Sequence, residues 1–445
     1  KTYYKYNDLT LRLDHLKTFS PSMDPQEDAQ GWAQGQGDLQ DLQYTYDAIG
    51  NITHIEDAVH TSAKGGSASG GDTQDFRYDE LNRLTSATGN YCVESLSFPR
   101  ALSGNPDDDQ TGSPIEDFGD DTTSTTSSLC TKTYAYDEIG NIITKGDLTY
   151  SYEQTGNAGP HAVTKITDPS GVDVFKFTYD ANGNMVVMDQ RMSSSSTVTT
   201  EYLYDSENRL SEAKKSGKKI AEYTYDGDGG RTKKRVFGKS SNSSLQSSAQ
   251  GVGFTFRGTL KSSPDLSSES EDSSLLNAET STICGERMPP ELCRQKRIEA
   301  AKANTTRYVG SLYEEHGSTK TRHIFLGSTR IASVTDGKVS YYHTNHLGST
   351  NVVTDETGAI TELIEYEPWG TFAVHEKYGS DSDTAWYYFT GKPLDDETGL
   401  YYYGARYYNP VVGRFITPDT IVPYASDPQS LNRYSYARNN PINVT

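Results

Sequence analysis

The most recognisable candidates for chemistry are two histidines in the segment YYHTNHLGST at 341–350. His343 and His346 stand three residues apart, so on a strand their side chains point to opposite faces of the sheet. A zinc site needs three or four ligands at suitable spacing, and neither a nearby third ligand nor a CxxC pair is present. We therefore predict structural roles for both histidines, with no metal site and no cofactor.

Two arginines, Arg406 and Arg414, stand among tyrosines in the C-terminal segment. A guanidinium above an aromatic ring gains about 0.5–2 kcal/mol of cation–π energy. A buried arginine also needs a carboxylate partner, and Asp395, Asp396 and Glu397 are close in sequence. These residues predict a structural network of arginines, tyrosines and acids.

The elements that must position these side chains come from a motif that recurs along the chain. It consists of an aromatic residue, any residue and Tyr-Asp, then two residues and a polar turn of Gly-Asn or Asn-Arg type. The clear copies are YTYDAIGNI (44–52), FRYDELNRL (76–84), YAYDEIGNI (134–142), FTYDANGNM (177–185), YLYDSENRL (202–210) and YTYDGDGGR (223–231), and YYKYNDLTLRL from residue 3 is a degenerate first copy.

Each copy of the motif predicts a β-hairpin. Two aromatic residues separated by one position place their rings on the same face of a strand. The aspartate caps backbone amides in the turn, and Gly or Asn accepts a positive φ. The Ile, Leu or Met that usually follows begins the returning strand. Because one hairpin cannot bury its own face, neighbouring hairpins must join into a continuous sheet.

The motif resembles the YD repeat, also called the Rhs repeat, over residues 1–235 and 307–444. The segment beginning YYFTGKPLDDETGLYYYGARYYNP at 387 resembles the Rhs-repeat-associated core. The His-Leu-Gly-Ser stretch leads into such cores, although Asn345 stands where the family usually has Asp. The N-terminal repeats look particularly like those of the B and C components of Tc toxin complexes. The resemblance implies an all-β fold, in which a spiralling antiparallel sheet of hairpins forms a hollow shell, or cocoon, with a C-terminal core plug.

The resemblance also implies a chemistry. In many Rhs cores this region resembles an aspartyl autoprotease that cuts the chain just after itself. Paired carboxylates can do this, since an ionised one activates water while its neutral partner protonates the leaving amide. Asp419 lies at the position of the family's Asp-Pro aspartate, Asp427 is a plausible second acid before LNRY, and Arg414 is a supporting residue.

The chain departs from the family pattern around these residues. Pro418 precedes the first aspartate where many members have Arg, and Thr420 follows it where they have Pro. The family continues beyond Asn-Asn-Pro to Asp-Pro-x-Gly and the cleavage point, whereas this sequence ends at Thr445. We therefore expect neither the scissile bond nor a toxin within it, and no activity on other molecules. The N-terminus does not resemble a signal peptide, which suggests a start within a longer protein.

Composition agrees with a tyrosine-rich β protein. Hydrophobic residues make up 33% of the chain, and its 32 tyrosines outnumber 13 phenylalanines and 3 tryptophans. The net charge of −20 argues against a general nucleic-acid surface. The sequence contains no run of 18 apolar residues and therefore predicts no membrane span.

The four cysteines are too few for a disulfide scaffold, so unpaired thiols are the default prediction. Two disulfides could nevertheless form in an oxidising compartment: Cys92 with Cys130, and Cys284 with Cys293.

Breaks in the motif divide the chain. We predict a repeat shell over 1–237, a low-complexity insertion with a short helix over 238–305, further hairpins over 306–386 and a truncated core over 387–445. The insertion helix is expected after Pro289 and Pro290. Gly- and Ser-rich stretches at 61–75 and 102–131 are predicted loops.

Two functions follow from the resemblance. The first is a shell segment of a secreted bacterial Rhs or Tc-type toxin that encapsulates a C-terminal effector, which core autoproteolysis would release. Its partners would be the toxin cargo in cis and other toxin-complex subunits or a secretion-system protein. The alternative is a cell-surface or wall-associated YD-repeat protein, such as the teneurins, for adhesion or carbohydrate binding.

Overall fold

The structure, a computed structural model, describes residues 1–19, 38–59, 72–89, 130–237, 304–378, 386–422 and 427–445. The chain divides into two compact units. Unit 1 comprises Lys1–Thr200, Tyr366–Ala373 and Thr417–Thr445, and unit 2 comprises Glu201–Glu365 and Val374–Ile416.

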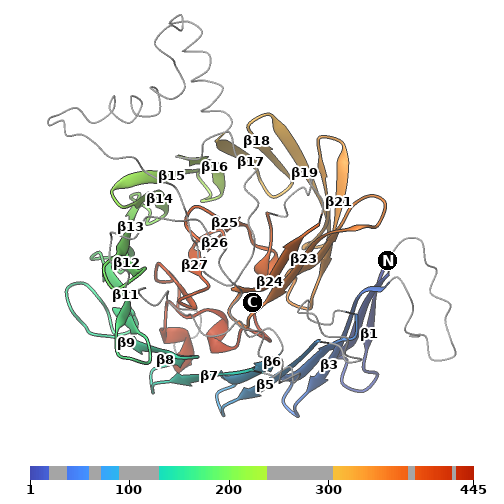
Figure 1. Cartoon of the computed structure of the whole chain (residues 1–445), viewed down its shortest axis with the longest axis horizontal. Coiled ribbons are helices and arrows are strands. Elements are labelled where there is room, and N and C mark those ends of the chain that lie inside the picture. Colours follow the sequence, from blue (N-terminus) through green and yellow to red (C-terminus); the bar gives the residue numbers. More distant parts are fainter. Residues whose placement is uncertain (20–37, 60–71, 90–129, 238–303, 379–385, 423–426) are drawn as a thin grey trace, which may run out of the picture. The chain divides into compact units, whose positions relative to one another are not determined.

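Strands dominate the described residues (Figure 1). Within the described ranges, 24 strands belong to one antiparallel sheet and four short strands to a second, and the helices are three short 3-10 turns. The predicted all-β fold of antiparallel hairpins is confirmed. The same ranges contain no helix that is long and apolar enough to cross a membrane.

The first sixteen strands precede the predicted insertion. They are β1 (Thr2–Tyr6), β2 (Leu13–Phe19), β3 (Asp38–Tyr46), β4 (Ile52–Asp57), β5 (Asp72–Tyr78), β6 (Leu84–Gly89), β7 (Cys130–Tyr136), β8 (Ile142–Lys145), β9 (Leu148–Ser151), β10 (Lys165–Thr167), β11 (Asp173–Tyr179), β12 (Met185–Arg191), β13 (Thr197–Tyr204), β14 (Leu210–Lys215), β15 (Lys218–Tyr225) and β16 (Arg231–Val236).

The remaining strands follow the insertion. They are β17 (Thr305–Val309), β18 (Tyr313–His316), β19 (Thr319–Leu326), β20 (Thr329–Thr335), β21 (Lys338–Thr344), β22 (Thr350–Thr354), β23 (Ile360–Tyr366), β24 (Phe372–Lys377), β25 (Leu394–Asp395), β26 (Leu400–Tyr402), β27 (Tyr407–Asn409) and β28 (Arg414–Phe415), and the 3-10 turns are η1 (Phe389–Gly391), η2 (Pro428–Leu431) and η3 (Ala437–Asn439).

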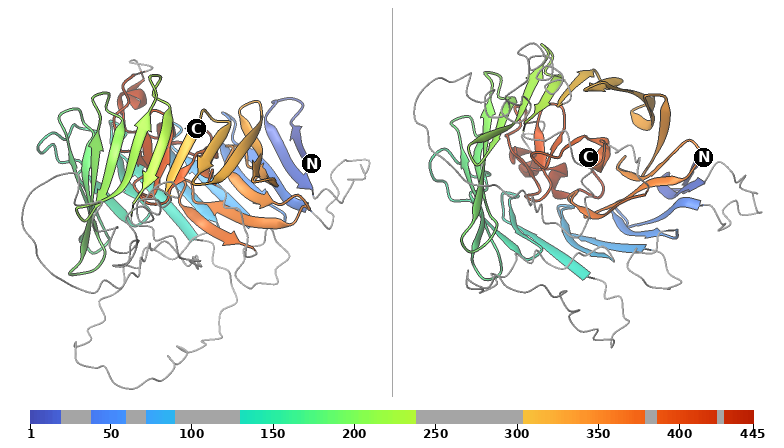
Figure 2. Two further views of the ribbon diagram at one scale, coloured as in Figure 1. Left: turned by 90° about the horizontal axis from the view of Figure 1, so that it is seen from above. Right: turned by 45° about the horizontal axis from the view of Figure 1, so that its top comes forward.

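Neighbours in sequence are neighbours in the sheet. In unit 1 each strand from β1 to β11 pairs antiparallel with the next. In unit 2 the same holds from β14 to β22. Figure 2 shows the yellow-green strands β14–β16 as adjacent arrows. The sheet is thus a strip built hairpin by hairpin, as the repeats predict.

The aspartate of each repeat organises its turn. Asp47 Oδ1 accepts hydrogen bonds from the amides of Ile49, Gly50 and Asn51 at 3.0, 2.7 and 2.8 Å, and Asn51 Nδ2 donates to Asp47 Oδ2 at 2.9 Å. Gly50 has a φ of 109°, a conformation that glycine adopts without steric cost. The predicted capping role of Asp is confirmed here and at Asp79, Asp137, Asp180, Asp205 and Asp226.

The second tyrosine of the motif ties each hairpin to the one before it. Tyr78 OH donates to the carbonyl of Ile52 at 2.6 Å, and Tyr136 OH donates to that of Leu84 at 2.7 Å. A β-bulge places this tyrosine, because the extra residue re-aims the side chain. At the second tyrosine of four clear copies in unit 1, the register shifts between Thr45/Tyr46, Arg77/Tyr78, Ala135/Tyr136 and Thr178/Tyr179.

The arginine of the Asn-Arg turns makes a further link. Arg83 Nε donates to Asp79 Oδ2 in its own turn at 2.7 Å. Its guanidinium also lies 4.7 Å from the ring centre of Tyr136 in the next hairpin and donates to the carbonyl of Asp137 at 3.3 Å. In unit 2, Arg209 makes the equivalent contacts with the following repeat. These contacts join each Asn-Arg turn to the hairpin that follows it.

The turn aspartates should contribute measurably to stability. Asp137 accepts two backbone amides and the Asn141 side chain, so Asp137→Ala is expected to lower the free energy of unfolding by about 2 kcal/mol. Urea-induced unfolding measures the change. The adjacent, exposed Glu138 provides the control, since Glu138→Ala should change stability by less than about 0.5 kcal/mol. Equal effects of the two substitutions would contradict the capping role.

Some sequence predictions lie outside the described residues. They include nearly all of the insertion at 238–305 with its helix, most of the loops at 61–75 and 102–131, and Cys92, Cys284 and Cys293. Cys130, at the start of β7, is disulfide-bonded. The default interpretation of an unpaired thiol is therefore wrong for this residue.

Candidate functional site

The C-terminal segment of unit 1, residues 427–445, lies against the turns of the repeats. Asn432 Nδ2 donates to the carbonyl of Gly140 at 3.0 Å, and Tyr434 OH donates to that of Gly183 at 2.6 Å. Asn439 also donates to Gly140, Asn440 to Asn51, Gln429 to Leu81 and Asn443 to Tyr78, and Asn443 accepts from the amide of Ile52. Residues 427–445 thus form one segment, here called the strap, that is hydrogen-bonded to several hairpins of unit 1. The strap includes Asp427.

Gly183 shows how closely this strap approaches a turn. Its φ is +85°, and a Cβ added there would lie 2.7 Å from the hydroxyl oxygen of Tyr434 and 3.3 Å from Pro418. The position therefore requires glycine for its backbone conformation and for its lack of a side chain. Pro418, the residue that departs from the family pattern, packs at this turn and places the residue that follows it, Asp419.

Asp419 is held through its main chain. Its amide donates to the carbonyl of Arg433 at 2.8 Å, and its own carbonyl accepts a hydrogen bond from Arg433 Nε. Its carboxylate accepts the amide of Ile421 at 3.0 Å. The first predicted acid is therefore fixed by the strap, with its side chain half-buried.

Asp427 is held through both carboxylate oxygens. Oδ1 accepts the amide of Gln429 at 3.0 Å and caps η2, and Oδ2 forms an ion pair with Nη2 of Arg438. The side chain remains 23% exposed. Sequence reasoning missed both Arg433 and Arg438. The signal was available, because these are the two cations of LNRYSYAR, and Arg433 alternates with buried Asn432 and Tyr434.

The predicted site residues do not all belong to one unit. Asp419 and Asp427 are in unit 1, whereas Arg414, predicted as their support, is in unit 2. There it begins β28, pairs across the small sheet with Asn409 and is 2% exposed. Arg406 lies 3.8 Å from the ring centre of Phe415, which confirms the predicted cation–π contact.

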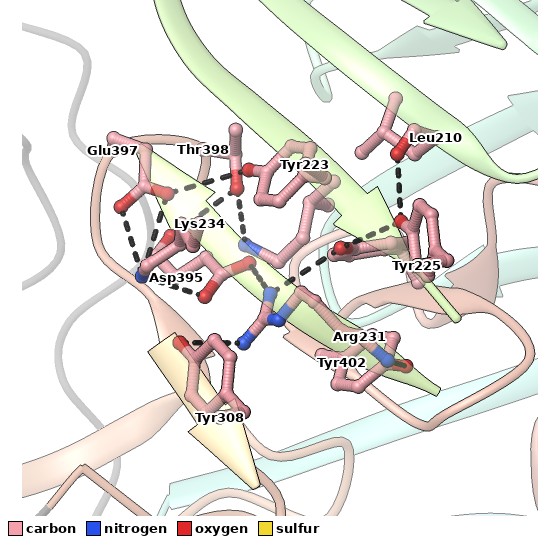
Figure 3. Close-up of polar contacts among 12 residues, drawn as sticks. Leu210, Tyr223, Tyr225, Arg231, Lys234, Tyr308, Asp395, Glu397, Thr398 and Tyr402 are labelled. Atoms are coloured by element: carbon pink, nitrogen blue, oxygen red, sulfur yellow. Dashed lines mark hydrogen bonds and ion pairs between the residues drawn. The ribbon is translucent and has the colours of Figure 1, made fainter. Parts of the chain in front are cut away.

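Unit 2 contains a buried charge cluster that the sequence analysis missed (Figure 3). Asp395 Oδ2 is 2.5 Å from Arg231 Nη1, and Asp395 Oδ1 is 2.8 Å from Lys234 Nζ. Glu397 lies 3.5 Å from Lys234, and Asp395 is fully buried. Asp395, one of the three acids suggested as partners for Arg406 and Arg414, pairs instead with Arg231 and Lys234 of β16.

The partners determine the charge of Asp395. Burial by itself would raise the pKa of Asp395, but the charges and hydrogen bonds of Arg231 and Lys234 outweigh it and hold that pKa below its usual value. For Glu397 burial dominates, and the pKa is raised despite the opposing charge of Lys234. The cluster therefore depends on Asp395 as its main anion.

The register of the repeats explains why β16 carries these cations. Arg231 and Lys234 occupy the two buried positions of the returning strand. In β14, the returning strand of the preceding hairpin, the same positions hold Leu210 and Ala213, both buried. Two cations at inward-facing positions require anions on the inside, and the core segment provides them.

The first histidine of 341–350, His343, has a structural contact. His343 Nε2 is 3.0 Å from Thr354 Oγ1 on the neighbouring strand β22. Burial lowers the pKa of His343 to about 4. In the part of the chain that the structure describes, no group of three or more His, Cys, Asp or Glu side chains is placed to hold a metal ion.

Known proteins match this chain through its repeats. A family model described as the teneurin YD-shell matches residues 305–442. Toxin subunit YenC1 of Yersinia entomophaga is 26% identical over 457 residues, which cover 99% of this chain and 39% of that protein. The tRNA3(Ser)-specific nuclease WapA of Bacillus spizizenii is 26% identical over 317 residues, 69% of this chain and 10% of that protein. The chain thus spans well under half the length of these relatives.

Solved structures share the fold. The crystal structure of TcdB2-TccC3-Cdc42 matches with a TM-score of 0.59 and 21% identity, over 100% of this chain and 18% of that one. The repeats, their hairpins and these matches show that the chain is similar to YD-repeat proteins, a Tc toxin subunit among them, and shares the β fold of the Tc toxin structure.

Proposed function

We propose that this chain is a shell segment of a secreted bacterial toxin of the Rhs or Tc type, which encapsulates a C-terminal effector. The observation that carries the proposal is the strap at 427–445, which is hydrogen-bonded to the turns of several hairpins. Chain continuing from such a strap would start from a fixed point on the repeat sheet. The proposed partners are the effector in cis and other toxin-complex subunits.

Two matched relatives support a carrier role. One is a toxin subunit and the other a tRNA nuclease, and each matches this chain over only part of its own length. A segment that occurs in proteins with different activities is expected to perform a task that these proteins have in common. Protection of a toxic domain before delivery is such a common task, and it requires no catalytic site in the repeats.

We further propose that the core releases the effector by self-cleavage, with Asp419 and Asp427 as the acids. One carboxylate would take a proton from water as the oxygen attacks the scissile carbonyl carbon. The carbon–nitrogen bond then breaks, and the other acid protonates the leaving amine. The products are a new carboxyl terminus and a new amino terminus, with one water consumed.

Denaturing electrophoresis of the longer protein with its native C-terminus tests self-cleavage. We expect two bands from the unmutated protein and one from Asp419→Asn or Asp427→Asn. The exposed Asp396, in the same core region, provides a control, and Asp396→Asn should still be cut. A single band from the unmutated protein would reject self-cleavage, and two bands from both mutants would point to an outside protease.

Encapsulation is tested separately by protease protection. The effector part should resist added protease in the native protein and become sensitive when the shell is unfolded by urea. Digestion of the effector at the rate of the isolated domain would contradict encapsulation, whatever the result for self-cleavage.

Adhesion is the second candidate function. Tyr3, Tyr4 and Tyr6 on β1 are 41%, 51% and 53% exposed, and exposed tyrosines suit sugar stacking and protein contacts. The teneurin YD-shell match also favours this function. Saccharide binding that is lost on replacing these tyrosines by alanine would support adhesion.

A further inference from the structure

The strap contains a turn with unusual backbone strain. Ala437, Arg438 and Asn439 have φ angles of 49°, 54° and 62°, and none is glycine. The left-handed conformation is disfavoured for residues with a Cβ, and three in a row are rarer than single instances. Such strain persists only where the surrounding structure imposes it.

The contacts that hold the strained turn come from the two residues that follow Arg438. Asn439 Nδ2 donates to the carbonyl of Gly140 at 3.0 Å, and Asn440 Nδ2 donates to Asn51 Oδ1 at 3.2 Å. Both asparagines are buried, whereas the Arg438 side chain is 54% exposed. The turn is therefore anchored by its neighbours, and Arg438 is the residue that it presents outward.

Arg438 is directed at one of the two predicted acids. Its Nη2 pairs with Oδ2 of Asp427, while Oδ1 of Asp427 accepts the amide of Gln429. Each carboxylate oxygen can accept a second hydrogen bond, so Asp427 can still receive a proton from water. An ordinary exposed ion pair contributes little to stability and would not by itself explain a three-residue left-handed turn.

We propose that Arg438 is a positioning residue for the self-cleavage reaction, and that the strained turn exists to hold it against Asp427. The inference rests on the proposed self-cleavage. Arg438 fixes the orientation of the Asp427 carboxylate and pairs with its charge. Asp427 is then the ionised group that takes the proton from water, and Asp419 is the acid that protonates the leaving amine.

The test uses the longer protein with its native C-terminus and follows the cleavage rate between pH 5 and 9. Arg438→Gly is the informative variant, because glycine adopts the left-handed turn without strain and removes only the side chain. We expect it to melt at the same temperature or higher, yet to cleave about 10- to 100-fold more slowly with a shifted pH optimum. Arg438→Lys should recover part of the rate, since it restores the positive charge.

Three results would overturn the proposal. Cleavage of Arg438→Gly at the unmutated rate with an unchanged pH profile rejects the role of Arg438 while leaving self-cleavage intact. A similar loss in Arg322→Ala, which removes an exposed arginine of unit 2, would show that the effect is not specific. An uncut unmutated protein rejects self-cleavage itself, and the role of Arg438 with it.

Discussion

Replacing Asp395 with asparagine is expected to lower the free energy of unfolding of unit 2 by about 3–5 kcal/mol. The substitution keeps the shape of the side chain but removes the charge that lies between Arg231 and Lys234. Both cations are buried, so water cannot solvate their charges when the carboxylate charge is removed. Glu397 cannot replace Asp395, because its distance to Lys234 is 3.5 Å and burial favours its neutral form.

Urea-induced unfolding with Asp396→Asn as the matched control measures this effect. Asp396 is the next residue and is exposed, so its change should stay within about 0.5 kcal/mol. Adding Arg231→Leu to Asp395→Asn should recover part of the loss, because leucine occupies the equivalent position in β14 and an apolar replacement of a buried ion pair is often tolerated. A loss below about 1 kcal/mol for Asp395→Asn would show that the cluster is hydrated.

Acidification from pH 7 to pH 4 is expected to cost unit 2 up to about 3 kcal/mol through His343 alone. The pKa of its imidazole is about 4 in the folded chain and 6.5 in the reference state. Above pH 6.5 the residue is neutral in both states and has no effect. As the pH falls below 6.5, the unfolded chain binds the proton first, so stability decreases until about pH 4 and then levels off.

His343→Gln isolates this contribution. Glutamine does not titrate and can still hydrogen-bond to Thr354, which contacts His343 in the native chain. Unfolding free energies at pH 7, 5.5 and 4 should fall more steeply for the unmutated protein than for the variant. Parallel curves would mean that His343 is hydrated and titrates normally when folded.

The hairpin and its turn could be predicted from sequence because their determinants are local. The aspartate, the Gly or Asn with positive φ and the alternating apolar residues all lie within one copy of the motif. Asp47 and Gly50 behave as predicted. The residues of one copy are sufficient to determine one hairpin. Repetition of the motif along the chain therefore predicts an antiparallel strip of hairpins.

The links between hairpins could not be predicted from one copy. The bulge before Tyr78 and its bond to the carbonyl of Ile52 depend on how two hairpins align. The same holds for Arg83, which contacts Tyr136 in the next repeat. These contacts join residues whose sequence separation varies with the length of the intervening segment, and a motif search within one repeat does not detect them.

The candidate site was predicted in part. Asp419 and Asp427 were named through a family resemblance, and their catalytic roles remain proposals. Their partners Arg433 and Arg438 were missed although both are visible as cations in LNRYSYAR, because the sequence alone does not show that this segment contacts Asp419 and Asp427. The cluster of Arg231 and Lys234 was also missed, although comparison with Leu210 and Ala213 at the same positions would have revealed two cations facing inward.

The two edges of the strip differ in a way that matters for protein engineering. Within each unit the YD turns lie on one edge, where turn length is set by the aspartate and its amides. On the other edge Gly89 pairs with Cys130, and Arg235 pairs with Thr305, so strand pairing resumes after very different lengths of chain. Because the entropic cost of loop closure rises only slowly with length, this edge is the natural place to graft an affinity tag, a fluorophore or a whole domain.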